Sequence, residues 1–295
     1  MSPDAPGARG WGGLVVLALT WGSAFALIGV AVETLPPALV AFGRLAIGAA
    51  ILIAWALMRG RAFPPLTDRR WLWFMALGLT GNALPFFLIA VGQQTVPSGL
   101  AGILIGAMPM VTISIAHLVI PSEKLTFIKA LGFSIGFAGV VILMGPAALE
   151  DLGGPYFLAQ LIIFGAGVSY AINAVLAQIM PETPPSVAGA GMLIGAVIWS
   201  APFGLWALVT MEAAPSAESV WALIVLGVFP TALASIVYMA IARKVGAAFI
   251  AQTNYYVPVV AALLGVALGE ALGVNAFIAL GIILLGMAVA RRKRI

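Results

Sequence analysis

The sequence is poor in charged residues and has no cysteine. Asp, Glu, Lys and Arg make up 8% of its 295 residues, whereas hydrophobic residues make up 63%. A water-soluble domain needs several times more surface charge, so composition excludes a cytosolic enzyme and a free nucleic-acid-binding protein. The missing cysteines exclude disulfides, iron–sulfur clusters and thiolate zinc sites. With one histidine and no cysteine, a two-histidine metal site and a Cys/His nucleophile are excluded as well.

Long apolar runs dominate what is present. A helix needs about 20 apolar residues to cross a hydrocarbon core of about 30 Å. Windows of that length predict an all-α integral membrane protein with ten transmembrane helices, at residues 11–31, 36–59, 71–91, 97–120, 125–144, 155–180, 186–209, 219–242, 246–268 and 274–290. The first window could pass for a signal peptide. We expect it to stay in the mature protein, because it is longer than a typical signal core and lacks a clear cleavage site.

The basic residues indicate the orientation of the spans. Thirteen of the fourteen Lys and Arg residues lie at the N-terminus, in the loops after the second, fourth and eighth spans, or in the C-terminal tail. All of these places fall on one side of the membrane, and the loops on the other side contain none. The positive-inside rule therefore predicts that both termini are cytoplasmic. The excess of positive charge orients the chain and does not indicate a nucleic-acid partner.

The two halves of the chain resemble each other when one is shifted by 149 residues. The shift places Glu33 and Pro36 on Glu182 and Pro185, and it places Pro109 on Pro258. A slightly shorter shift aligns Glu123–Leu125 with Glu270–Leu272. We therefore predict two five-helix repeats, 1–149 and 150–295. Five is an odd number, so the repeats are inverted in the membrane, as in many transporters that work by alternating access. The alternative is a duplication that only builds a stable bundle.

The repeated proline and Glu-x-Leu segments resemble the EamA domain pair of the drug/metabolite transporter superfamily. The resemblance covers essentially the whole chain and is closest to the YddG-type branch of aromatic amino-acid exporters. It implies a ten-helix exporter of aromatic and other neutral amino acids, and of flat cationic drugs, in a bacterial inner membrane. Ala271 departs from the Arg or Lys typical of the family, so we assign no function to Lys124.

Arg44 is the only Lys, Arg, Asp or Glu residue well inside a predicted span. A charge in the membrane is costly, so Arg44 should face the bundle interior or water. Its partner is either a substrate carboxylate or a structural group, such as Glu33 or carbonyls freed at a helix break. His117 lies near the cytoplasmic end of its span, where it is either a proton relay or a neutral, hydrogen-bonded imidazole.

Span 246–268 carries a stripe of polar and aromatic residues. Gln252, Tyr255 and Tyr256 share one helical face, which should avoid lipid because its amide and hydroxyls need partners. Pro258 and Pro109 each remove a backbone N–H and are predicted hinges, whose broken turns could offer backbone dipoles to a substrate. The alternative is that the stripe joins helices and that the kinks are harmless.

Further candidates for the central site come from repeat symmetry and from polar residues within spans. Trp21 and Tyr170 align at the 149-residue shift. The other candidates are Asn82, Asn173, Ser235 and Tyr238. Aromatic rings would pack against an apolar substrate group while amides and hydroxyls hold its polar end. Core packing could explain any one of these residues.

Glycines concentrate in spans 125–144 and 274–290, where few polar residues accompany them. They are Gly132, Gly136, Gly139, Gly281 and Gly286. Small residues let helices approach closely, so we expect these two spans to be supporting or contact helices at the periphery.

These features together predict a secondary transporter of small amphipathic metabolites in the lipid bilayer, with no cofactor, no metal and no enzymatic activity. An intramembrane enzyme would have to use carboxylates, and these sit at span ends. Alternatives are a nucleotide-sugar or drug transporter of the same superfamily, or a polytopic channel. Several buried basic residues would be expected for phosphate groups, and one is present. With no carboxylate inside a span, we expect transport without proton or sodium coupling.

Overall fold

Every regular element described by the computed structural model is helical, which confirms the all-α prediction for that part of the chain. The model describes residues 7–106, 108–119, 126–150, 154–245 and 253–290. The elements are α1 (Ala8–Val32), α2 (Pro37–Met58), α3 (Arg70–Gly78), η1 (Leu79–Ala83), α4 (Leu84–Gly92), α5 (Ser98–Ile105), α6 (Met108–Val119), α7 (Phe127–Glu150), α8 (Pro155–Ile179), α9 (Pro185–Thr210), α10 (Ala217–Leu226), η2 (Gly227–Leu233), α11 (Ala234–Val245), α13 (Thr253–Ala267) and α14 (Val274–Ala290).

Six of the described helical runs are long and apolar enough to cross a membrane. They are Gly10–Val32, Pro37–Met58, Arg70–Gly92, Pro155–Ala177, Pro185–Thr210 and Ala217–Ala240. The other four predicted windows hold α5 with α6, α7, α13 and α14, which are not among these six runs. Proline stands in the first turn of α2, α8 and α9, where its missing N–H leaves no intrahelical bond unmade. The membrane class is confirmed, while the count of ten spans and their inversion stay predictions.

The two predicted hinge prolines lie in different settings. In the 97–120 window, α5 ends at Ile105 and α6 begins at Met108, so Pro109 stands in the first turn of α6 and its role as a hinge stays a prediction. Pro258 instead lies inside α13, which continues as a helix from Thr253 to Ala267. The ring of Pro258 packs at the end of α5, where a Cβ on Gly106 would lie 3.1 Å from the Pro258 Cβ.

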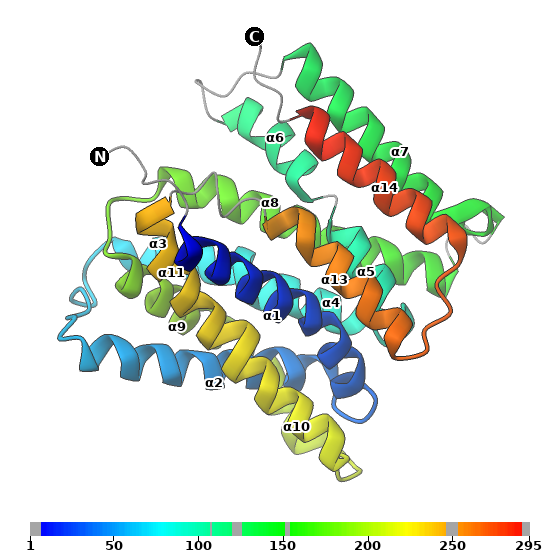
Figure 1. The fold of residues 1–295 in the computed structure, drawn as a ribbon. Helices are drawn as coiled ribbons and strands as arrows, with labels where there is room; N and C mark the ends of the chain where they lie inside the picture. The colour runs from blue at the N-terminus through cyan, green and yellow to red at the C-terminus, as the bar shows by residue number, and fades with distance from the viewer. Residues whose placement is uncertain (1–6, 107, 120–125, 151–153, 246–252, 291–295) are drawn as a thin grey trace.

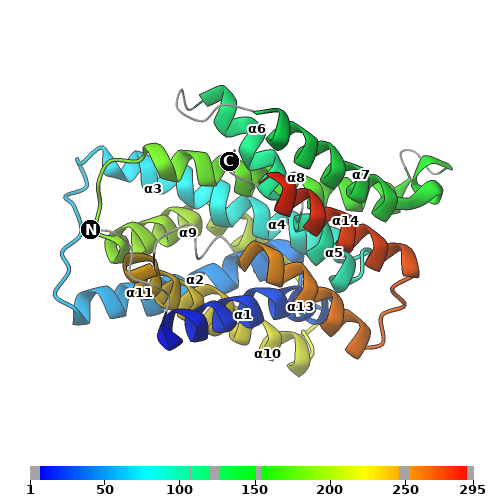
Figure 2. The ribbon, with the colours of Figure 1, turned by 45° about the horizontal axis from the view of Figure 1, so that its top comes forward.

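Helices of one half pack mainly on helices of the other half. The helix α1 lies against α10 and α13, α2 and α3 lie against α9, and α4 lies against α8. Figures 1 and 2 show α13 running alongside α1, with α5 next to α13. Lipid is as apolar as leucine, so close side-chain and backbone contacts stabilise such a bundle more than burial from water does.

The helices α7 and α14 form a pair at one edge of the bundle (Figure 1), where we predicted supporting helices. A Cβ on Gly286 would lie 2.6 Å from the Gly132 carbonyl oxygen and 2.6 Å from the Gly136 nitrogen. A Cβ on Gly139 would lie 3.1 Å from the Ala279 carbonyl oxygen. These contacts are between backbones, as expected for small residues at a membrane helix interface. Gly281 is different, because nothing lies within 4 Å of a Cβ placed there.

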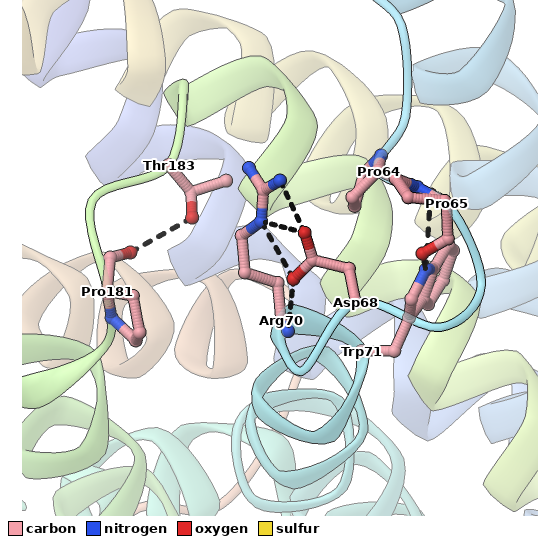
Figure 3. Close-up of polar contacts among 7 residues, drawn as sticks. All are labelled: Pro64, Pro65, Asp68, Arg70, Trp71, Pro181 and Thr183. Atoms are coloured by element: carbon pink, nitrogen blue, oxygen red, sulfur yellow. Dashed lines mark hydrogen bonds and ion pairs between the residues drawn. The ribbon is translucent and has the colours of Figure 1, made fainter.

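The loop between α2 and α3 is tied down by polar contacts (Figure 3). The Asp68 carboxylate accepts hydrogen bonds from the Arg70 backbone N–H, at 2.8 Å, and from the Arg70 guanidinium. The Trp71 indole N–H donates to the carbonyls of Pro64 and Pro65. The Arg70 hydrogen bonds lower the pKa of Asp68 to about 2. Because this pKa is depressed on folding, the pair stabilises the loop above about pH 4 and is lost only as the pH falls further.

Candidate functional site

Arg44 is buried in the middle of the bundle, with 4% of its surface exposed. Its Nε donates a hydrogen bond to the Thr231 hydroxyl at 3.3 Å, and its Cζ lies 3.7 Å from the centre of the Phe86 ring. Tyr170 of α8 is close enough to interact with it electrostatically. Among the described residues, the one ion pair joins Asp68 and Arg70, so no carboxylate there neutralises Arg44.

The structural partner that we considered for Arg44 is therefore the wrong one. Glu33 is exposed at the end of α1 and makes no ion pair with Arg44. The observed partner is the hydroxyl of Thr231 in the π-helix η2, rather than a carbonyl freed at a helix break. A hydroxyl and an aromatic face stabilise a guanidinium but leave its charge uncompensated.

The turn η2 is a π-helix, a form that often occurs at functional sites. Thr231 Oγ1 donates to the Leu226 carbonyl at 2.8 Å and also accepts from Arg44. The Trp21 indole N–H donates to the Pro230 carbonyl at 3.2 Å, and the Ser235 hydroxyl donates to the Thr231 carbonyl at 2.6 Å. Two candidate residues thus bind the backbone of η2 directly.

A second π-helix, η1, lies in the corresponding part of the first half. Asn173 of α8 donates to the Leu77 carbonyl at 3.0 Å and to the Thr80 hydroxyl at 3.2 Å. The Ser169 hydroxyl donates to the Thr80 carbonyl at 2.8 Å. Gly81 leaves room for this contact, because a Cβ there would lie 2.5 Å from Asn173 Nδ2.

Backbone carbonyls of both π-helices are paired within the protein. The η1 carbonyl of Thr80 and the η2 carbonyls of Pro230 and Thr231 each accept a hydrogen bond from a neighbouring side chain. A backbone carbonyl without a hydrogen bond inside a membrane costs several kcal/mol of free energy, about as much as moving an unpaired amide from water into an apolar environment. Asn173, Trp21 and Ser235 therefore stabilise this part of the fold, and their predicted contacts with substrate stay a prediction.

Asn82 carries a buried polar atom that has no hydrogen-bond partner. The residue lies in η1, and the atom is its Nδ2. Phe86, which packs on Arg44, follows it by one helical turn, so both side chains project from the same face. Asn82 also aligns with Thr231 at the 149-residue shift. The two π-helices thus place an unpaired amide donor and the hydroxyl that holds Arg44 at corresponding positions.

A pair of aromatic side chains also lies next to η2. The rings of Trp21 and Tyr238 have centres 6.2 Å apart and are tilted by 41°. Trp21 is partly buried, whereas Tyr238 is 40% exposed. This pair is linked to the Arg44 cluster through the backbone of Pro230 and Thr231. The predicted site residues from α1, α2, η1, α8 and α11 therefore gather around the two π-helices.

The candidates of span 246–268 are not part of this cluster in what the structure describes. Tyr256 is 42% exposed on α13. Gln252 lies outside the described residues, and for Tyr255, Pro109 and His117 the structure describes the helix but not the side chain. The helical face predicted from their spacing stays a prediction.

The cluster has the chemistry of a binding site. Among the described residues, no group of three or more His, Cys, Asp or Glu side chains could hold a metal ion. A buried guanidinium with an unpaired amide donor nearby suits a carboxylate, and flanking aromatic rings suit an apolar group. Sequence reasoning missed Thr231 and Phe86. Pro230 inside a span and the alignment of Thr231 with Asn82 were the available signs.

Comparisons with known proteins show which family this chain resembles. The profile described as the EamA-like transporter family matches residues 9–145 and 157–292. An Escherichia coli (strain K12) protein named "Uncharacterized inner membrane transporter YedA" is 31% identical over 282 residues, which cover 95% of this chain and 89% of that protein. An "Uncharacterized transporter" of Archaeoglobus fulgidus is 25% identical over 288 residues, 95% of this chain and 99% of its own.

The fold is also similar to a solved structure. A protein whose crystal structure carries no functional description superposes with a TM-score of 0.68 at 25% identity. The match covers 97% of this chain and 98% of the other.

Proposed function

This chain belongs to the EamA-like transporter family, and from that premise we propose that it exports a small metabolite bearing a carboxylate, a neutral or aromatic amino acid being the first candidate. Arg44 binds the carboxylate at the centre of the bundle. The two halves open this site to the two sides of the membrane in turn. The relatives are named as transporters, and their names give no substrate.

One observation carries the choice of substrate class: Arg44 is buried, and no described carboxylate pairs with it. A buried guanidinium is costly unless an anion neutralises it, and a substrate carboxylate would do so while bound. The free Asn82 Nδ2 supplies a second donor within the same cluster. A single buried Arg suits one carboxylate better than the phosphates of a nucleotide sugar.

The aromatic residues support an amphipathic substrate. Phe86 covers one face of the Arg44 guanidinium. Trp21 binds the Pro230 carbonyl of η2 and its ring lies next to the Tyr238 ring. An amino acid with an apolar or aromatic side chain would place its carboxylate at Arg44 and its side chain against these rings. Tyr255, Tyr256 and Gln252 complete the pathway in this proposal, because their helical face is too polar for lipid.

The function is tested by counterflow in proteoliposomes that contain the purified protein. Liposomes preloaded with an unlabelled amino acid should take up the labelled compound, and neutral and aromatic amino acids should be better substrates than cationic drugs. Saturable exchange that other substrates compete with distinguishes a transporter from a channel. Exchange of none of the carboxylate-bearing compounds, together with exchange of a drug, would contradict the proposal.

We expect this flux to need no ion gradient. The described acidic residues lie at helix ends or in loops, and ion coupling requires a group that binds the ion within the membrane. Counterflow should therefore proceed with equal pH and equal salt on both sides. Accumulation driven by an imposed proton or sodium gradient, and lost in His117→Ala or Glu33→Gln, would overturn this prediction and identify the coupling residue.

Topology can be tested separately. Because thirteen Lys and Arg residues fall on one side, both termini and the 59–70 loop should face the cytoplasm. A green fluorescent protein fused after Ile295 should fluoresce, and alkaline phosphatase fused at the same place should be inactive. Phosphatase activity at the C-terminus would show the opposite orientation.

A further inference from the structure

The carboxylate of Glu270 binds the first turn of α5, a helix in the other half of the chain. Its Oε1 accepts hydrogen bonds from the backbone N–H of Ser98, at 2.8 Å, and from the Ser98 hydroxyl. Its Oε2 accepts from the backbone N–H of Gly99 at 2.8 Å. One side chain from the loop between α13 and α14 thus takes up two backbone donors and one hydroxyl donor at the start of α5.

The start of α5 has no cap of its own. The preceding residue, Pro97, makes no side-chain hydrogen bond to the helix. The first N–H groups of a helix have no intrahelical acceptor, and the helix dipole favours a negative charge there. Glu270 meets both needs from 172 residues away along the chain.

The surrounding residues make room for this contact. A Cβ on Gly99 would lie 3.2 Å from Glu270 Oε2 and 2.8 Å from Leu272 Cδ1, and a Cβ on Gly265 would overlap the carboxylate. The loop itself is folded tightly, because the Glu270 N–H bonds to the Gly265 carbonyl at 2.9 Å and Gly269 has a φ of +85°. Only glycine adopts that φ without strain.

The contact closes one end of the interface between α5 and α13. These helices lie side by side in Figure 1, with Gly102 against Ala261. At the same predicted outer end, Thr34 Oγ1 accepts from the Ser216 N–H at 3.0 Å, which joins the α1–α2 loop to the start of α10. Two of the polar contacts between the halves therefore lie where the site would have to open to the outside.

We propose that Glu270, Ser98 and Gly99 form the latch of the outer gate. The latch is made when the outer end is closed and breaks when α5 separates from the α13–α14 loop to release substrate. This inference rests on the proposed alternating-access function. It assigns to Glu270 a conformational role in place of ion binding or substrate binding.

The absence of cysteine gives a direct test, since one introduced cysteine is then the only thiol. Ala262 is buried on α13 beside Gly99, beneath the latch. In Ala262→Cys, a membrane-impermeant maleimide applied from outside should react slowly. Adding Glu270→Gln or Glu270→Ala should raise the rate by about tenfold or more, because charge-assisted hydrogen bonds that favour the closed state are lost. Adding Glu218→Gln, an exposed carboxylate at the start of α10, should leave the rate unchanged.

A second reporter separates gate opening from unfolding. Ala196 is fully buried on α9, so Ala196→Cys should stay unreactive when Glu270 is replaced. Faster labelling at both positions would show general loosening and would overturn the latch, as would an unchanged rate at Ala262→Cys. The readout needs no transport, so failure of the amino-acid assay leaves it interpretable. Faster labelling only in inside-out vesicles would place the latch at the inner end and contradict an outer gate.

Discussion

Replacing Arg44 with glutamine should abolish binding of carboxylate-bearing substrates while the protein still folds and inserts. Loss of one partner from a buried, hydrogen-bonded charge pair costs about 2–5 kcal/mol, which is roughly thirty-fold to several-thousand-fold in Kd. Stability should hold or rise, because the variant no longer buries a charge whose described partners are a hydroxyl and an aromatic ring. Isothermal titration of the purified protein measures the loss in affinity.

Two further variants test whether the effect depends on the shape of the Arg44 side chain and on its position. Arg44→Lys keeps the charge but loses the planar fork and the stacking on Phe86, so binding should be intermediate. Arg59→Gln makes the same chemical change just past the end of the same helix, where the side chain is exposed, and should bind like wild type. Wild-type affinity in Arg44→Gln would show that Arg44 has a structural role only.

The second large effect should come from Gly286. In Gly286→Ala, the new methyl group would meet the backbone of Gly132 and Gly136 at 2.6 Å, and backbone atoms cannot swing aside as a side chain can. Overpacking of this kind costs about 1–3 kcal/mol. At roughly 2–4 °C per kcal/mol for a chain of this size, Tm in detergent should fall by several degrees.

Gly281→Ala is the matched control for this prediction, because it makes the same change on the same helix. Nothing lies within 4 Å of a Cβ at that position. Alanine is a better helix former than glycine by up to about 1 kcal/mol, so Tm should stay the same or rise slightly. Equal losses of Tm in the two variants would contradict the assigned packing of α14 on α7.

The helices themselves were largely predictable from local sequence. Apolar runs ending at proline, glycine or charge placed α2 and α8 within a few residues of their observed bounds. A helix boundary near Pro109 was also foreseeable, because proline disturbs the turn that precedes it. The continuity of α13 through Pro258 was not, because a helix tolerates proline when its neighbours pack around it.

Several residues of the proposed site could be named from the sequence, but the residues they contact could not. Arg44 was identifiable as the charge inside a span, yet Thr231 lies 187 residues away in sequence. The π-helices depend on side chains from α1 and α8 that satisfy their carbonyls, and no local pattern encodes that dependence. Glu270 was identifiable as part of a repeated motif. Its bond to α5 emerges only when the two halves are packed together.

We propose above all that Arg44 binds the carboxylate of the transported compound. It is tested most directly by exchange of a labelled aromatic amino acid in proteoliposomes, with the unlabelled amino acid or its decarboxylated amine as competitor. We expect the unlabelled amino acid to inhibit exchange in the wild-type protein and the amine to have no effect. Arg44→Gln should not exchange the labelled amino acid. Equal inhibition by the amine, or wild-type exchange in Arg44→Gln, would contradict it.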